Sequence, residues 1–345
     1  MEATMKMIKY VVALSVLALN PLQVAAQESF YVGSWGGFFE KLIREEIIPN
    51  FERDHKVKVE YVSGNSTDTL AKLQAQKGNQ KLDIAIADDS AMHMAIQLGF
   101  CRKINDLPTT LYESARFPED KAVGFGLLGT GIVYNKEYFA KQGWPAPTSW
   151  TDIADPKYKG KLILPPVIST YGLHTLLMMA QIQGGGPNNI EPGFDYIKTK
   201  VAPNVLSFEP TQGKFTELFQ SGQAVIGIWG SAPMKSFMDT GFPVEFVYPK
   251  EGSPGQRTSV CPVAKDRDSG LADAWIKAML ALDFQGVFAK KYGYGPARKD
   301  APVMPDEAKL APIGERATKL ISLDWAAINQ HRAAWTDRWN REIER

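Results

Sequence analysis

The sequence predicts an α/β protein of two lobes, each a mainly parallel sheet flanked by helices, with a hinge and a ligand cleft between the lobes. The first observation is that short apolar strands alternate with helix-periodic segments along most of the chain, which is typical of parallel sheets. The second is a pair of similar strand-to-helix turns, GSWGG at residues 33–37 and WGS at residues 229–231. Because ligands bind beyond the carboxyl ends of parallel strands, we expect these turns to face each other across one cleft.

Residues 1–26 have the three parts of a secretory signal peptide. Lys6 and Lys9 precede an apolar run at residues 10–19, and small residues end the segment at Ala26. The apolar run is shorter than the roughly 20 residues that span a membrane, and no cysteine lies near the expected cleavage after Ala26. The sequence therefore predicts a soluble protein in the periplasm of a Gram-negative bacterium, without a lipid anchor.

The composition excludes some partners and scaffolds. A net charge of +1 provides no basic field for nucleic acid or a membrane surface, so we expect no nucleic-acid partner. Cys101 and Cys261 are the only cysteines, which excludes a disulfide-rich scaffold. In an exported protein they either form one disulfide or remain two buried thiols that never meet.

The mature chain begins with a strand, a glycine-rich turn and a helix in residues 29–51. Apolar residues recur at helical spacing from Phe38 onward, so the turn directly precedes a helix N-terminus. Unpaired N–H groups and glycines there allow a ligand to approach the backbone, with the Ser34 hydroxyl and the Trp35 ring beside it. The alternative is a tight turn around a core tryptophan.

The strand-turn-helix rhythm then repeats. A strand at residues 56–62 leads into a helix, and a strand at residues 82–87 leads through Asp88, Asp89 and Ser90 into another. Each of these turns points to the same edge of a parallel sheet. Asp88 and Asp89 either contact the ligand or cap the following helix, and the sequence leaves both roles open.

A glycine-rich stretch at residues 124–135 predicts a hinge where the chain leaves the first lobe. A strand that begins at residues 161–164 is followed by Ser169, Thr170 and Tyr171 and then by a helix. This is the ligand-facing turn of the second lobe.

The chain then completes the second lobe and returns. A short apolar strand ends at Trp229 and Gly230, directly before a helix. Residues 250–258 form a polar, glycine-rich stretch that we interpret as a loop, the return crossing to the first lobe, and this loop carries Arg257 and Thr258.

Three tryptophans mark the C-terminal helix, which we expect at residues 322–341. The spacing of Trp325, Trp335 and Trp339 indicates packing, so we assign them to the core rather than to a site. The expected lobe boundaries are residues 27–130 plus 256–302 for lobe 1, and residues 131–255 plus 303–345 for lobe 2.

The order of several stretches resembles the solute-binding subunits of bacterial ABC importers, and among them the subgroup of spermidine/putrescine-binding proteins. The stretches are GSWGG, LAKLQAQ, LDIAIADDS, TGIVYNKEYF, PTSWTDIADPKYKGKLIL and AVIGIWGSA. The similarity covers nearly the whole mature chain, and residues 147–164 are its most specific part. It implies the type II periplasmic-binding fold, closure of two lobes on a small molecule, and a monomer that docks on an inner-membrane permease.

The resemblance also implies which residues face the ligand. They are Ser34, Trp35, Gly36, Asp88, Ser90, Thr130, Ser169, Thr170, Tyr171 and Trp229, and the adjoining residues Asp89, Gly230, Arg257 and Thr258 complete the predicted set. Where polyamine binders place a carboxylate after the return crossing, this chain has a threonine preceded by an arginine, which disfavours a diamine. The adjacent ligand tyrosines of ferric-iron binders are also missing.

This departure favours a small zwitterion. Arg257 would bind its carboxylate or phosphonate, Asp88 or Asp89 would bind its amine, and the aromatic side chains of the turns would form stacking walls. Aminoalkanoates such as γ-aminobutyrate and aminoalkylphosphonates have this chemistry. The alternatives are an uncharged or anionic metabolite held by Arg257 alone, a polyamine, and an Arg257 that is merely solvated in its loop.

An exported enzyme and a chemoreceptor-linked sensor are the function classes that compete with transport. The four histidines are scattered, and the sequence has no zinc HExxH, serine-hydrolase or phosphate-loop motif. We therefore predict no enzyme, no catalytic residue, no metal and no cofactor. Transport and sensing are not separated, because both use the closed two-lobe surface.

Overall fold

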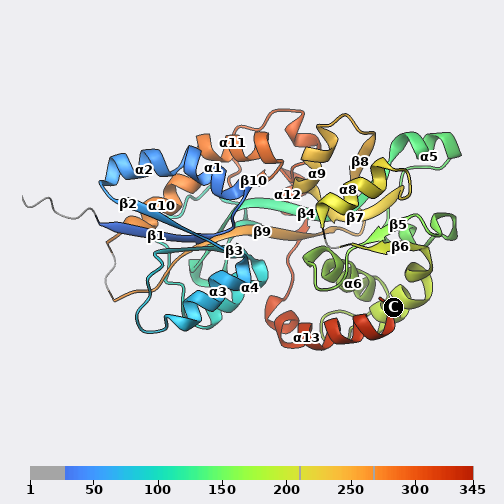
Figure 1. Ribbon diagram of the computed structural model, residues 1–345, viewed down its shortest axis with the longest axis horizontal. Helices are drawn as coiled ribbons and strands as arrows, with labels where there is room; N and C mark the ends of the chain where they lie inside the picture. Colours follow the sequence, from blue (N-terminus) through green and yellow to red (C-terminus); the bar gives the residue numbers. More distant parts are fainter. Residues whose placement is uncertain (1–27, 210, 267–268, 345) are drawn as a thin grey trace, which may run out of the picture.

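The computed structural model describes residues 28–209, 211–266 and 269–344, and the predicted signal peptide at residues 1–26 lies outside the described residues. Two long strands, β4 (Val123–Asn135) and β9 (Ser253–Pro262), run along the long axis through the middle of the molecule (Figure 1). The other elements gather around their two ends, which gives the fold its two halves.

The remaining elements follow the expected alternation. The strands are β1 (Ser29–Ser34), β2 (Lys58–Ser63), β3 (Ile84–Asp88), β5 (Leu162–Leu164), β6 (Val205–Phe208), β7 (Ile226–Gly230), β8 (Val244–Val247), β10 (Gly295–Pro296) and β11 (Leu320–Ile321). The helices are α1 (Phe38–Glu46), α2 (Ile48–His55), α3 (Ser66–Ala75), α4 (Asp89–Gln97), α5 (Lys136–Gln142), α6 (Thr170–Ile182), α7 (Glu191–Tyr196), α8 (Gln212–Gln220), α9 (Ser231–Met238), α10 (Leu271–Met279), α11 (Leu282–Tyr292), α12 (Glu315–Thr318) and α13 (Trp325–Glu342). A π-helix at Ile197–Val201 follows α7 directly.

The main path of the sheet has the order β2-β1-β3-β9-β4-β7-β5-β6. At one end β1 pairs in parallel with β2 and β3, and at the other end β5 pairs in parallel with β6 and β7. Between these blocks β9 is antiparallel to both β3 and β4, and β4 is antiparallel to β7. The two parallel blocks are thus joined by two crossing strands. We call them the first block (β1–β3) and the second block (β5–β7).

Each block is covered by helices on both faces. In the first block, α1, α2, α10 and α11 share one core and α3 and α4 share another on the opposite side of the sheet (Figure 1). In the second block, α6, α7 and α13 share a core, and α8 and α9 pack on the other face. The carboxyl ends of the parallel strands therefore lead into α3, α4, α6 and α9 near the middle of the molecule.

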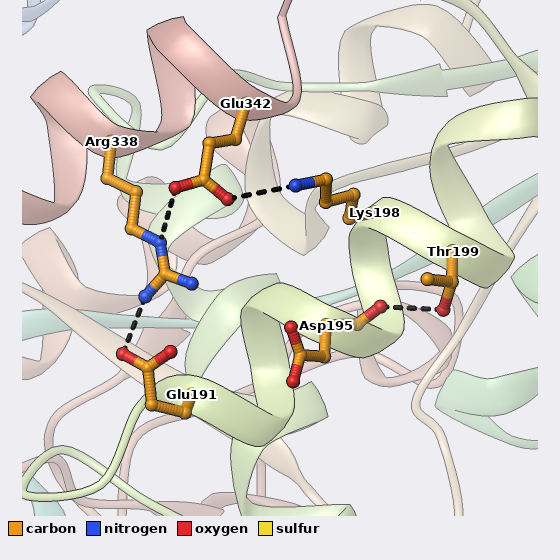
Figure 2. A network of polar contacts seen from close by, with 6 residues as sticks. All are labelled: Glu191, Asp195, Lys198, Thr199, Arg338 and Glu342. Carbon is orange, nitrogen blue, oxygen red and sulfur yellow. Dashed lines mark hydrogen bonds and ion pairs between the residues drawn. The ribbon is translucent and has the colours of Figure 1, made fainter.

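The C-terminal helix α13 belongs to the second block. Trp325, Trp335 and Trp339 are all buried in the core of that block, which confirms that they pack. Figure 2 shows a polar network that fastens the end of the helix: Arg338 donates to Glu191 (2.6 Å) and Glu342 (3.0 Å). Lys198 of the π-helix donates to the same Glu342 (3.2 Å). This anchoring fixes where the other half of α13 points.

Two segments differ from the sequence-based expectation. The glycine-rich stretch at residues 124–135 does not precede a strand but is part of β4 itself, one of the two crossing strands, which is buried along almost its whole length. The polar stretch at residues 253–258 is not a loop but the first part of β9. Its glycine and proline content indicates a loop, yet backbone pairing with β4 on one side and with β3 or β11 on the other holds it extended.

A disulfide joins Cys101 to Cys261, which decides between the two alternatives that the sequence left open. The two Cα atoms are 5.7 Å apart and 160 positions separate the residues. The bond links the segment after α4 to β9, so it ties the first block to a crossing strand. None of the described helices is long and apolar enough to cross a lipid bilayer.

Candidate functional site

A hollow of about 730 Å³ lies where α3 and α4 of the first block meet α6 and α13 of the second. The first turns of three of these helices open into it, and α13 contributes its side. The lining residues are Ser66, Thr67, Leu70, Ala71, Gln74, Asp88, Ser90, Ala91, Met94, Ile168, Ser169, Thr170, Asn329, Arg332 and Ala333.

On the first-block side, Asp88 ends β3 and caps α4, because its carboxylate accepts a hydrogen bond from the Ala91 N–H (3.3 Å). The Asp88 N–H donates to the Ser66 hydroxyl (3.1 Å), and the Trp35 indole N–H donates to the same oxygen (3.1 Å). Burial raises the pKa of the Asp88 carboxyl, the neighbouring Asp89 adds to the rise, and the bonds from Ala91 and Ser66 oppose it. This side of the hollow therefore presents a desolvated carboxylate.

On the second-block side, α6 begins without a side-chain cap. Ser169 is its N-cap residue, but its hydroxyl accepts no hydrogen bond from the helix. Gly172 lets the turn pack tightly, since a Cβ there would lie 2.2 Å from the Pro166 carbonyl oxygen. The first N–H groups of a helix have no partner inside it and carry partial positive charge. The α6 turn thus offers donors where the α4 turn offers an acceptor.

Arg332 of α13 is the cation at this hollow. Its Nη1 donates to the Ser90 hydroxyl (3.0 Å) and its Nη2 to the Ile168 carbonyl oxygen (2.9 Å), so it touches both blocks. Asn329, one turn earlier, exchanges two hydrogen bonds with Ser90. Within the part of the chain that the structure describes, Nε of Arg332 has no hydrogen-bond partner, which leaves donor capacity for a ligand.

The charges of Asp88 and Arg332 influence each other across the hollow. Burial lowers the pKa of the Arg332 guanidinium, and the Asp88 carboxylate opposes that change. Nearby His174 is buried, shares a hydrogen bond with Thr130 (2.6 Å) and has its pKa lowered to about 3 by desolvation and then by Arg332. Near neutral pH, His174 is therefore uncharged, so Asp88 and Arg332 dominate the field.

Four of the predicted site residues meet in the hollow: Asp88, Ser90, Ser169 and Thr170. The predicted aromatic walls lie elsewhere. Tyr171 packs against Trp229 with ring centroids 5.1 Å apart, and the Tyr171 hydroxyl lies close against Gly230. Because Trp229 is only 3% exposed and also packs on Phe215, this cluster belongs to the core of the second block in the present conformation.

The remaining residues of the predicted first turn and the crossing are near the hollow without lining it. Trp35 is half-buried and reaches the site only through Ser66, while Ser34 is buried and Gly36 is exposed. Thr130 is buried, and its hydroxyl group shares a hydrogen bond with His174.

The predicted role of Arg257 needs correction. Arg257 lies inside β9 and is only 9% exposed, so it is not a solvated loop residue either. Its backbone N–H and Nε donate to the two Asp89 oxygens (2.7 and 2.5 Å), which leaves neither Asp89 nor Arg257 facing the hollow. The hydroxyl of Thr258 likewise bonds a backbone oxygen, that of Gly126 (3.2 Å). The predicted clamp is an internal ion pair.

Sequence reasoning missed Arg332, Asn329 and Ser66. Arg332 and Asn329 lie three residues apart and therefore on one face of α13, beside the face that carries the tryptophans. This spacing is a local signal for a polar face, but the three tryptophans of the same helix favour packing. Among the described residues no group of three or more His, Cys, Asp or Glu side chains is placed to hold a metal ion.

Comparisons with known proteins agree with the fold. The chain matches the profile of the family described as "Bacterial extracellular solute-binding protein" over residues 46–312. The chain belongs to this family. The spermidine/putrescine-binding periplasmic protein of Salmonella typhimurium is 23% identical over an alignment 330 residues long, and the match covers 88% of each chain.

Solved structures place this solute-binding protein in the same fold. An ABC transporter protein from Clostridium perfringens has a TM-score of 0.79 at 21% identity and covers 91% of this chain and 99% of its own. The periplasmic binding protein AfuA from Actinobacillus pleuropneumoniae, with fructose-6-phosphate bound, has a TM-score of 0.69 at 21% identity over 92% and 98% of the two chains. The predicted periplasmic-binding fold is confirmed, and the protein is the solute-binding component of an ABC transporter, a class that binds rather than transforms its ligand.

Proposed function

We propose that this solute-binding protein captures a small zwitterion, with an amine at one end and a carboxylate, phosphonate or phosphate at the other. In this proposal the Asp88 carboxylate accepts the ammonium group. Arg332, together with the first turn of α6, binds the anionic group. Arg332 takes the role that the sequence suggested for Arg257.

The observation that carries the proposal is that one hollow of about 730 Å³ is lined by both a carboxyl group from the first block, Asp88, and a guanidinium cation from the second, Arg332. Hydrogen bonds to charged groups contribute about 1.5–3 kcal/mol each when both partners are desolvated. Ser66, Ser90 and Thr170 add hydroxyl groups to the lining of the hollow. A ligand with one charge satisfies one side and leaves the other unpaired.

Delivery completes the proposed function. The mature protein would act as a monomer in the periplasm after removal of residues 1–26. A ligand that contacts α4 from the first block and α6 and α13 from the second favours the closed arrangement by its differential affinity. The closed lobes, at residues 27–130 plus 256–302 and 131–255 plus 303–345, would then dock on an inner-membrane permease.

Polyamine binding is the competing proposal. The similarity to a spermidine/putrescine-binding protein and the Asp88 carboxylate favour it. Arg332 opposes it, because a second ammonium group would meet a like charge at the other side of the hollow.

A thermal-shift screen of the mature protein tests the proposal. The panel is γ-aminobutyrate, 2-aminoethylphosphonate, fructose-6-phosphate, glutarate, putrescine, spermidine and ferric citrate. A ligand at about a hundred times its dissociation constant adds roughly 2.7 kcal/mol to the free energy of unfolding, which raises Tm by a few degrees.

We expect a shift with an aminoalkanoate or aminoalkylphosphonate, and its loss in Arg332→Met. Arg341→Met is the matched control, because Arg341 is on the same helix but does not line the hollow. A shift with diamines that survives Arg332→Met would contradict the zwitterion and return the protein to the polyamine binders.

A further inference from the structure

The buried ion pair of Asp89 and Arg257 lies directly behind the hollow, and neither of its residues lines the hollow. We infer that Arg257 is a positioning residue, which through Asp89 fastens the first turn of α4 to the crossing strand β9. Asp88 and Ser90, on either side of Asp89, are thereby held at the wall of the hollow. This inference rests on the proposed function, since it assigns to those two residues their ligand contacts.

Every nitrogen of the Arg257 side chain has a partner in the first block. Nε donates to Asp89 (2.5 Å), Nη1 donates to the Arg116 carbonyl oxygen (2.7 Å), and Nη2 donates to His93 Nε2 (3.2 Å). The guanidinium also lies 3.8 Å from the ring centroid of Phe117. The guanidinium group of Arg257 therefore connects β9 to α4 and to the segment that follows α4.

The backbone geometry makes the pair an extension of the sheet. Asp88, the last residue of β3, is opposite Thr258 of β9, and the Arg257 N–H donates to Asp89 (2.7 Å) just beyond that pair. The sheet ladder between β3 and β9 thus continues into the first turn of α4. At Gly124 of β4 a Cβ would lie 3.1 Å from Arg257 Cβ and Cγ, so a glycine gives the arginine stem room to cross.

The Asp89–Arg257 pair also connects the wall of the hollow, formed by Asp88 and Ser90, to β9, the strand that joins the two blocks. β9 pairs with β3 in the first block and continues past β4 towards β11. A shift of β9 during closure would move Asp89, and with it the carboxylate of Asp88 and the Ser90 hydroxyl that Arg332 binds. A purely structural ion pair elsewhere in the first block would have no such effect.

The test uses the full mature chain with Arg257→Met, Arg257→Lys and Asp89→Asn, and γ-aminobutyrate and 2-aminoethylphosphonate as probes. Arg102→Met is the matched control, because Arg102 forms an ion pair with Asp273 (3.0 Å) in the same block, away from the hollow. Two readouts are taken well below Tm: probe affinity by calorimetry, and amide hydrogen exchange of residues 89–91 without ligand.

We expect Arg257→Met to weaken probe binding at least tenfold and to speed exchange at residues 89–91 at least tenfold, with exchange in α3 and α6 unchanged. Lysine reaches Asp89 but cannot reproduce the fork, so Arg257→Lys should recover part of both readouts. Asp89→Asn, which keeps the shape and removes the charge, should give intermediate values and serves if Arg257→Met does not fold. Arg102→Met should lower Tm and leave affinity within twofold.

The two readouts separate this inference from the proposed function. If the wild type binds neither probe, the proposed ligand class is wrong, and the exchange of residues 89–91 alone decides on positioning. Unchanged exchange in Arg257→Met and Asp89→Asn would overturn the inference. Equal loss of affinity in Arg102→Met would also overturn it, because the effect would then be one of general stability.

Discussion

The first turns of α4 and α6 face the same hollow from opposite blocks, but they are built in opposite ways. The α4 turn is closed: Asp88 caps it, and the Asp89–Arg257 ion pair ties it to β9. The α6 turn has no side-chain cap, and Arg332 bonds the Ile168 carbonyl two residues before its first helical residue. The α4 turn thus presents a carboxyl group to the hollow, and the α6 turn presents N–H donors beside the Arg332 cation.

The difference indicates how a symmetric scaffold produces a polar site. Both turns follow parallel strands, and both place a helix N-terminus at the hollow, which alone favours anions. A carboxylate in the cap position consumes the donors of α4 and leaves a net negative charge. In the proposed complex, the cap residue of each block and Arg332 of α13 therefore set which end of the ligand lies at which block.

The largest expected effect on ligand binding comes from reversing the charge of Arg332. Arg332→Glu places three negative groups at one hollow, namely the Asp88 carboxylate, the introduced carboxylate and the anionic end of the ligand. It should weaken zwitterion binding by about 4 kcal/mol, roughly a thousandfold. Putrescine should bind this variant better than it binds the wild type. Isothermal titration measures both, with Arg341→Glu as the control for added negative charge on α13. Unchanged zwitterion affinity would remove Arg332 from the site.

Removing the charge of Asp88 should weaken ligand binding less than Arg332→Glu does, and it should raise the stability of the protein without ligand. Asp88→Asn keeps an N-cap of similar quality, so α4 should remain capped. It also removes a buried charge, so we expect Tm without ligand to rise by about 2 °C. The affinity for aminoalkanoates should fall about 10- to 100-fold, while that for a simple carboxylate should change little. A fall of both affinities to the same extent would contradict an amine contact at Asp88.

The pH dependence of ligand affinity should report the ionisation of the Asp88 carboxyl group. Burial raises the pKa of Asp88, and the group must be ionised to accept an ammonium group. Affinity should therefore be full above that raised pKa and decline by up to about tenfold per pH unit below it, at a pH above the usual range of aspartates. His93 and His174 have pKa values lowered to about 4 and about 3 by desolvation, so neither accounts for a decline at higher pH. The decline should be missing in Asp88→Asn.

The smallest effect concerns helix capping. Asn65, which caps α3, accepts from the Asp68 N–H at 2.9 Å, so Asn65→Ala should cost about 1 kcal/mol in the free energy of unfolding. Ser169 makes no cap bond to α6, so Ser169→Ala should cost less than about 0.5 kcal/mol. Urea denaturation of the two variants measures the difference. Equal costs would mean that the α6 turn is capped in solution.

Much of this molecule was predictable from local sequence. Strand-to-helix turns, the alternation of elements and the burial of Trp335 and Trp339 follow from periodicity and glycine placement, which are local properties. The predicted members Asp88 and Ser169 reached the hollow because the carboxyl ends of parallel strands share an edge.

The errors arose where distant contacts decide. Arg257 lies in a stretch rich in glycine and proline that only pairing with β3 and β4 turns into a strand, and its partner Asp89 is 168 positions away. Arg332 approaches Ser90 across 242 positions, through the anchoring of α13 on the second block. No local pattern separates an arginine that is paired inside the fold, such as Arg257, from one that lines the hollow, such as Arg332.

The central claim is that the two sides of the hollow bind the two ends of one ligand, and calorimetry with three related compounds tests it most directly. Wild type, Asp88→Asn and Arg332→Met are titrated with γ-aminobutyrate, with butyrate, which lacks the amine, and with butylamine, which lacks the carboxylate. We expect both substitutions to weaken γ-aminobutyrate, only Arg332→Met to weaken butyrate and only Asp88→Asn to weaken butylamine. If each substitution weakened all three compounds alike, or neither weakened any, the account of a two-sided site would be contradicted.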